Sequence, residues 1–108
     1  MQISAVIITF NEEDNISSCI ESIEQIVDEI IVVDSFSTDK TVEIAKRYSK
    51  VKCYSQKWLG YVEQKNYANS LTTFNTILSI DADELLSQQL KESILKLKEL
   101  DENLLKVY

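Results

Sequence analysis

The feature that most constrains the fold is a regular alternation of short apolar runs with segments of helical periodicity. Residues 3–9 (ISAVIIT) and 29–33 (EIIVV) are continuous runs rich in β-branched side chains, as in strands that are buried on both faces. Residues 51–54 and 76–80 predict two further, shorter strands. Each of these runs is followed by a polar segment and then by a stretch with helical spacing.

Four helices are predicted in these intervals. The first begins near residues 11–14, which offer a capping residue and three acids for its positive end. The second runs through residues 40–48 with its basic residues in the last turn, and a weaker third spans residues 61–71. Ser87 is the predicted N-cap of the fourth helix, whose apolar face consists of Leu90, Ile94, Leu97 and Leu100.

This order of elements predicts an α/β fold with a parallel sheet, helices on both faces and right-handed crossovers. We expect the strand order 3-2-1-4, because the polar ends of the first, second and fourth strands then converge at one edge. Those ends read TFNEED at residues 9–14, DSFSTD at 34–39 and DADE at 81–84. Since ligands of open parallel sheets bind at the carboxyl ends of the strands, the sequence predicts one ligand site built from these segments.

Composition restricts the classes of ligand that this site could bind. The 108 residues carry a net charge of −7 and no cluster of Lys or Arg, so a nucleic-acid polymer is excluded as a partner, because it requires a basic footprint. Gly60 is the only glycine, which excludes the glycine-rich phosphate loops of the Rossmann and Walker types. Histidine is absent, so zinc is not expected, and any metal ion should be a hard one with oxygen ligands.

Two carboxylates at the end of the fourth strand offer such ligands. Asp81 and Asp83 stand at positions i and i+2, so they can point to the same side, roughly 7 Å apart at Cα. The pair can hold Mg²⁺ or Mn²⁺, whose remaining coordination sites a diphosphate completes. The sequence thus predicts a small anionic ligand that is bound through a divalent ion.

Two features concern the compartment of the chain. No apolar run approaches the roughly 20 residues of a membrane span, and residues 1–9 lack the layout of a secretory signal. Cys19 and Cys53 show no metal-type spacing and are expected to be buried, reduced thiols. The first of these features predicts a cytoplasmic protein.

Four segments carry a resemblance to a known family: AVIITFNEEDNI, DEIIVVDSFSTDKTVEIAKRY, WLGYVEQKNYA and ILSIDADE. Together they resemble the N-terminal half of inverting family 2 glycosyltransferases of the GT-A fold, particularly bacterial lipopolysaccharide-core sugar transferases. The similarity covers residues 3–84. It implies a Rossmann-like domain of an enzyme that moves a sugar from a nucleotide diphosphate donor, most often UDP-linked, to a glycan or lipid-linked acceptor in cell-envelope polysaccharide synthesis.

The resemblance also implies contacts for individual residues by matching position. Thr9 and Phe10 should lie against the nucleobase, with the Phe10 ring stacked on it, and Asn11 belongs to the same substrate-binding segment. Asp34 resembles the acid that accepts a hydrogen bond from the uracil imide or the ribose. Lys65 stands near the base and phosphates, where the family often has arginine. The compact charge of the lysine ammonium thus replaces the planar guanidinium group of arginine.

On the metal side, Asp81 resembles the acid near the ribose and the ion, and Asp83 resembles the direct metal ligand. Glu84 is expected to be an exposed or helix-leading acid. Lys40 replaces a glycine that is common in the family at this position, and is expected to reshape that loop.

Simpler interpretations of the same residues stay open. Phe10 could equally be a core aromatic at the end of a strand. Asp34 could be an acid that forms a turn, and Lys65 could be a surface lysine. A nucleotide-binding module without catalysis fits the pattern, and a phosphotransferase or receiver-like domain that uses Asp81 or Asp34 fits it less well. UDP binding that requires Mn²⁺ would favour the transferase, whereas an acyl phosphate formed from acetyl phosphate would favour the phosphotransferase and receiver classes.

The expected domain organisation is one donor-binding subdomain over residues 1–108, truncated at its C-terminal end. No catalytic residue is assigned in it, because the general base of the family lies well downstream of the D-x-D segment. The residues after Glu84 predict a single amphipathic helix instead. One sheet edge is expected to be open to self-association, and the full-length protein is expected to meet the membrane peripherally.

Overall fold

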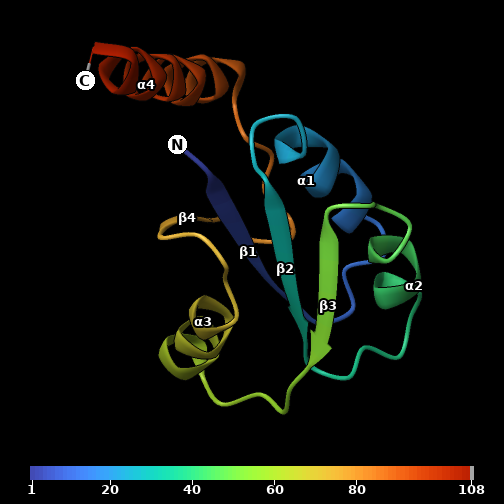
Figure 1. Ribbon diagram of the computed structural model, residues 1–108. Coiled ribbons are helices and arrows are strands. Elements are labelled where there is room, and N and C mark those ends of the chain that lie inside the picture. Colours follow the sequence, from blue (N-terminus) through green and yellow to red (C-terminus); the bar gives the residue numbers. More distant parts are fainter. Residues whose placement is uncertain (108) are drawn as a thin grey trace.

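The computed structural model describes the backbone of residues 1–107 and the side chains of residues 1–100. All the strands and helices expected from the sequence are present in this part of the chain (Figure 1). In chain order they are β1 (Ile3–Thr9), α1 (Ile16–Ile23), β2 (Glu29–Asp34), α2 (Thr41–Ala45), β3 (Val51–Ser55), α3 (Tyr61–Ser70), β4 (Thr76–Ser79) and α4 (Gln88–Val107).

The strands form one parallel sheet in the order β3-β2-β1-β4, which confirms the predicted α/β topology. The strand β1 lies between its two partners: Thr9 pairs with Asp34 of β2, and Val6 pairs with Ser79 of β4. Because the strands run in the same direction, the segments that follow β1, β2 and β4 leave the sheet at the same edge. The three polar strand ends therefore converge there, as expected.

Helices cover both faces of the sheet, as predicted, with α1 and α2 on one side and α3 on the other (Figure 1). Alternate side chains of a strand point to opposite faces, because a strand has a period of two. Ile7 and Ile30 belong to the core beneath α1 and α2, whereas Val6 and Ile31 pack with Ala68 of α3. Almost every residue of β1 and β2 is buried, which explains their continuous apolar sequences.

The start of α1 differs from the sequence expectation. The helix begins at Ile16 rather than within residues 11–14, and Asn15 caps it without a side-chain hydrogen bond. The side chain of Asn11 instead accepts a hydrogen bond from the backbone N–H of Thr38 (2.8 Å). The polar residues of this segment thus join two loops, a long-range contact that local capping rules do not include.

The helix α2 is shorter than expected. It ends at Ala45, so the prediction that Lys46 and Arg47 lie in its last turn is wrong. The chain leaves the helix here because it must turn into β3. Within this turn Tyr48 donates a hydrogen bond from its hydroxyl to the carboxylate of Glu21 on α1 (2.9 Å), which ties the two helices together.

The helix α4 begins as predicted, but most of its apolar face is not covered. The Ser87 hydroxyl accepts the expected N-cap hydrogen bond from the backbone N–H of Leu90 (3.1 Å). Ile94 packs against the core, whereas Leu90, Leu97 and Leu100 are between 46% and 59% exposed. Figure 1 shows the reason, because α4 projects beyond the sheet. Across residues 1–107 no helix is both long and apolar enough to cross a membrane.

Both cysteines are free thiols, and only one of them is buried. Cys19 lies in the core on α1, as expected. Cys53 is half-buried, so the prediction of a buried thiol is wrong at this position. The reason is that β3 stands at an edge of the sheet and its residues are only partly covered.

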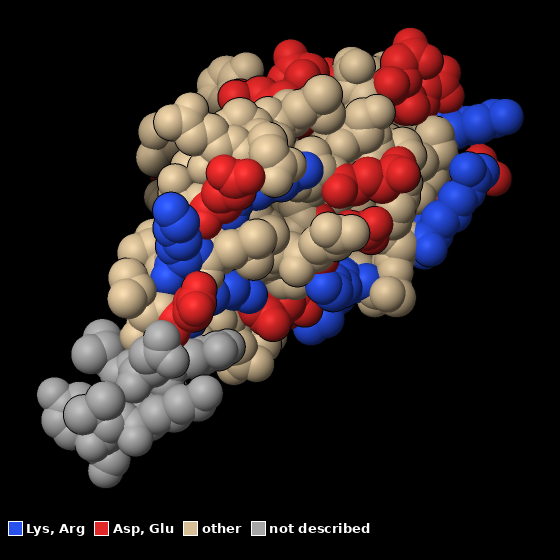
Figure 2. Space-filling view, turned by 90° about the horizontal axis from the view of Figure 1, so that it is seen from above, with Lys and Arg blue, Asp and Glu red and all other residues tan. Residues whose placement is uncertain are grey.

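Charged side chains of both signs are mixed on the face shown in Figure 2. Lys and Arg lie among Asp and Glu there, so this face has no continuous basic stripe.

Candidate functional site

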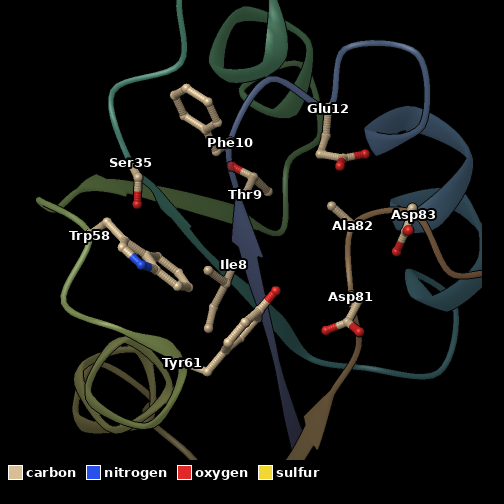
Figure 3. Close-up of a pocket in the computed structure, with 10 residues that line it drawn as sticks. All are labelled: Ile8, Thr9, Phe10, Glu12, Ser35, Trp58, Tyr61, Asp81, Ala82 and Asp83. Atoms are coloured by element: carbon tan, nitrogen blue, oxygen red, sulfur yellow. The ribbon is translucent and has the colours of Figure 1, made fainter.

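A pocket of about 570 Å³ lies at the carboxyl edge of the sheet (Figure 3). Its size falls within the range of about 300–1,000 Å³ that is typical of small-molecule sites. The ends of β1, β2 and β4 contribute to it, together with the loop between β3 and α3. The residues that line it are Ile8, Thr9, Phe10, Glu12, Ser35, Trp58, Tyr61, Asp81, Ala82 and Asp83.

The pocket has two chemically different sides. Figure 3 shows the aromatic rings of Phe10, Trp58 and Tyr61 toward one side, and the carboxylates of Asp81 and Asp83 on the other. The Trp58 and Tyr61 rings meet edge to face, with centroids 5.0 Å apart and an interplanar angle of 89°. Phe10 is 56% exposed, so its ring is available to a ligand rather than packed in the core. This excludes the simpler interpretation of Phe10 as a core aromatic.

The carboxylate side is built by a tight turn after β4. The Asp81 carbonyl accepts a hydrogen bond from the backbone N–H of Glu84 (2.9 Å), and the Glu84 carboxylate accepts one from the backbone N–H of Asp81 (2.9 Å). Ala82 is buried against the core, whereas the residues on either side of it are exposed. The turn therefore directs Asp81 and Asp83 into the pocket and uses Glu84 to hold its own backbone.

Cys19 lies directly beneath this turn. Its Sγ donates a hydrogen bond to the Asp81 carbonyl (3.4 Å). Burial raises the pKa of the thiol to about 12, and the negative charges of Glu84, Asp83, Asp81 and Glu12 add to the effect. Three of these acids, Glu12, Asp81 and Asp83, line the same pocket.

The residues present fit a divalent ion that is shared with a ligand. Among the described residues no group of three or more His, Cys, Asp or Glu side chains could enclose a metal ion. The pair Asp81 and Asp83 nevertheless supplies two carboxylates that open into the pocket. Mg²⁺ and Mn²⁺ are commonly held by one or two carboxylates with phosphate oxygens and water completing the shell, so this donor set suits them. No lysine or arginine is among the described residues that line the pocket, so an anionic ligand needs such an ion.

Asp34 lies beneath the pocket rather than in its wall. It is 2% exposed, and its carboxylate accepts hydrogen bonds from the Thr9 hydroxyl (2.7 Å) and from the backbone N–H of Ser37 (2.8 Å). The Ser37 hydroxyl is a third donor. These bonds fasten the turn that contains Phe36, a non-glycine residue with a positive φ of 57°. Asp34 therefore acts here as a turn-forming acid, and its contact with a ligand stays a prediction.

Asn11 and Lys65 are also outside the lining of the pocket. Asn11 has a φ of 50°, and its backbone N–H donates a hydrogen bond to the Ser37 hydroxyl (2.8 Å), so that it joins the loops after β1 and β2. Lys65 lies half-buried on α3. The roles of both residues in ligand binding stay predictions.

Several lining residues were not assigned from the sequence. Trp58, Tyr61, Glu12 and Ser35 line the pocket, and although they stand within the polar strand ends and the segments that carry the family resemblance, no ligand contact was assigned to them. One signal was available for Trp58: the chain has a single tryptophan, and it stands two residues before the only glycine. Gly60 has a φ of +94°, which marks a sharp turn at the start of α3.

The parallel 3-2-1-4 sheet and the two-sided pocket at its carboxyl edge define an α/β domain of the GT-A glycosyltransferase class. The chain belongs to glycosyl transferase family 2, whose family model matches residues 4–105. This match confirms the resemblance drawn from the sequence segments.

Individual relatives agree with this family. An uncharacterized glycosyltransferase of Rickettsia felis is 53% identical over 93 residues, which make up 86% of this chain and 32% of that protein. The lipopolysaccharide core biosynthesis glycosyltransferase LpsC of Rhizobium meliloti is 38% identical over 96 residues, or 85% of this chain and 35% of that protein. The chain thus spans about a third of the length of these curated relatives.

A solved structure with the same fold contains both a metal ion and a nucleotide. Glucosyl-3-phosphoglycerate synthase from Mycobacterium tuberculosis, in complex with Mn²⁺, UDP and phosphoglyceric acid, has a TM-score of 0.68 and 32% sequence identity. The comparison covers 78% of this chain and 34% of that one.

Proposed function

We propose that this chain is the donor-binding part of a metal-dependent, inverting glycosyltransferase. It binds a nucleotide diphosphate sugar, UDP-linked, whose sugar is transferred to a glycan or lipid-linked acceptor. The observation that carries the proposal is the pocket with aromatic rings on one side and paired carboxylates on the other. The solved relative with UDP and Mn²⁺ supports the donor and the ion, and the similarity to LpsC supports a role in cell-envelope polysaccharide synthesis.

The two sides of the pocket suit the two halves of such a donor. The base lies against Thr9 and the exposed ring of Phe10, where stacking contributes about 1–3 kcal/mol. The diphosphate lies toward Asp81 and Asp83, with Asp83 as the direct ligand of Mg²⁺ or Mn²⁺. The ion neutralises charge on the departing diphosphate when it is bound. Asp34 holds the turn that shapes the base side.

Inverting transfer also requires a carboxylate that takes the proton of the acceptor hydroxyl as it attacks the anomeric carbon. Such general-base assistance contributes typically about 10²–10⁴-fold in rate. We place this base beyond the D-x-D turn, in the acceptor-binding part of the protein. By itself, the chain then behaves as a nucleotide-binding module. We further place the reaction in the cytoplasm, with the full-length protein meeting a lipid-linked acceptor at the membrane surface.

Calorimetry of UDP binding tests the proposal. We expect binding in the presence of Mn²⁺ that falls at least about tenfold with EDTA or with Asp83→Ala, since a charge-assisted contact of 1.4 kcal/mol or more is lost. Asp14→Ala is the matched control, because Asp14 is an exposed acid outside the pocket lining. UDP binding that is unchanged by chelation would show that the carboxylate pair holds no ion for the donor.

A further inference from the structure

We infer that Gln64 is the positioning residue that holds Trp58 and Tyr61 in place as the aromatic side of the pocket, an inference that rests on the proposed donor site. Gln64 stands in the segment WLGYVEQKNYA, but the sequence assigned it no role. Its side chain is nevertheless 0% exposed on α3, a helix whose other residues are mostly polar and exposed. A glutamine is seldom buried so completely without hydrogen-bond partners that account for it.

The partners of Gln64 lie on both sides of Trp58 in the sequence. The amide Nε2 donates hydrogen bonds to the Gln56 carbonyl (3.4 Å) and to the Ser35 hydroxyl (3.0 Å). The amide Oε1 accepts a hydrogen bond from the backbone N–H of Leu59 (3.3 Å). One side chain therefore fastens the chain before and after Trp58 to the turn that follows β2.

This fastening matters because the segment has no regular structure of its own. Residues 56–60 belong to neither a strand nor a helix. The backbone N–H of Gln56 bonds to the Asp34 carbonyl (2.9 Å) where the segment begins, and the Gly60 carbonyl accepts from the backbone N–H of Gln64 (2.9 Å) where it ends. Trp58 lies between these anchors and is 47% exposed. Its orientation depends on the amide of Gln64.

The position of Ser35 connects this network to the pocket. Ser35 lines the pocket and also receives the Gln64 amide, so the distance between the end of β2 and the Trp58 loop is set by that bond. Tyr61 contacts the Trp58 ring edge to face, so the two rings form one surface. Gln64 thus controls the width of the aromatic side without being in the pocket lining itself.

The first test needs no ligand. Trp58 is the only tryptophan, so acrylamide quenching of selectively excited tryptophan fluorescence reports on this loop alone. Gln64→Met keeps the volume of the side chain and removes its hydrogen bonds, and we expect Trp58 to become more accessible to acrylamide. Ser35→Ala removes only one of these hydrogen bonds and changes a smaller side chain. We therefore expect a smaller increase in the accessibility of Trp58 to acrylamide. Unchanged quenching in a folded Gln64→Met protein overturns the inference, and Ser35→Ala decides it if Gln64→Met does not fold.

The matched control is Ala68→Gly. Ala68 is buried on the same helix and packs against the sheet, so its replacement destabilises α3 without touching the amide network. We expect Ala68→Gly to leave the quenching of Trp58 unchanged. Equal quenching increases in Ala68→Gly and Gln64→Met would mean that general loosening of α3 explains the effect, and would overturn a specific role for Gln64.

The second test measures UDP affinity with Mn²⁺. We expect Gln64→Met to weaken binding about tenfold, as the loss of one or two hydrogen bonds predicts, while Ala68→Gly binds as the original chain does. A Gln64→Met protein with unchanged affinity overturns the inference. If the original chain binds no UDP, the proposed function fails, whereas the quenching result still decides whether Gln64 holds Trp58.

Discussion

Replacing Glu29 with glutamine should remove a large, pH-dependent part of the stability of this fold. Glu29 is the first residue of β2, at the amino-terminal end of the parallel strands and therefore opposite the pocket. It is 4% exposed. Its carboxylate accepts hydrogen bonds from the Ser4 hydroxyl (2.6 Å), the Thr73 hydroxyl (3.0 Å) and the Lys52 ammonium (3.0 Å), and from the backbone N–H of Thr73. One buried charge thus joins β1, β2, β3 and the loop before β4.

The magnitude follows from the pKa of this carboxyl group. Burial by itself would raise the pKa, but the hydrogen bonds from Ser4, Thr73 and Lys52 outweigh it and lower the pKa from 4.5 to about 2. At about 1.4 kcal/mol per pKa unit, this corresponds to about 3 kcal/mol of stability at neutral pH. This stability value is an upper limit, because the Lys52 side chain is 54% exposed and solvent screens its interaction with Glu29.

The sign of the pH dependence is fixed by the direction of the change. A carboxyl group whose pKa is lower in the folded state stabilises it fully above the unfolded value of 4.5, and the contribution is lost as the pH falls toward about 2. Glu29→Gln resembles the protonated acid at every pH. The free energy of unfolding of the two proteins should therefore differ by up to about 3 kcal/mol at neutral pH and converge below pH 4.5.

Urea unfolding followed by circular dichroism at several pH values measures this difference. Glu63→Gln is the matched control, because Glu63 is an exposed glutamate on α3, and we expect it to change stability by less than about 0.5 kcal/mol. A gap between the original chain and Glu29→Gln that stays constant as the pH falls would refute the reasoning. It would mean that the shape of the side chain, rather than its charge, stabilises the fold.

Three further outcomes are expected. Cys53 should react with a disulfide reagent at mildly alkaline pH well before Cys19, because Cys19 is buried and its pKa is raised to about 12; equal rates would contradict the burial of Cys19. The chain should release no UDP from UDP-sugars with Mn²⁺ above the rate without protein, and sustained release that Asp83→Ala abolishes would place a general base within residues 1–108. The chain should self-associate in sedimentation experiments through the β4 edge, where Ile77 is 38% exposed, and Ile77→Lys should reduce this; a monomer at high concentration would count against an open edge.

Much of the fold was predictable because its main signals are local. Continuous β-branched runs identified β1 and β2. The right-handed crossover rule, together with the expected convergence of the polar ends of the first, second and fourth strands, then predicted the order 3-2-1-4. The carboxylate side of the pocket was predictable for a similar reason. Asp81 and Asp83 stand two residues apart just after a predicted strand, which indicated that both could point to one side. In the structure a turn gives this arrangement, with the buried Ala82 between them.

The aromatic side of the pocket was not predictable in this way. Trp58 stands in a loop without periodicity, and its position depends on bonds between Gln64, Ser35 and Leu59. In the sequence Gln64 looks like any polar residue on a helix surface. Only the packing of α3 against the sheet buries it and decides which groups its amide can reach.

The same division applies to the whole chain. The sequence by itself determined the strands, most helix positions, the sheet order and the carboxylate pair, since these follow from periodicity, chirality and spacing along the chain. Only the tertiary structure decided that Asn11 joins two loops instead of capping a helix, and that Asp34 accepts hydrogen bonds from Thr9 and Ser37. It also decided that most of the apolar face of α4 remains exposed. Each of these features depends on contacts between residues that are far apart in the sequence. The type of a side chain and its sequence neighbours do not indicate which distant residue it will contact.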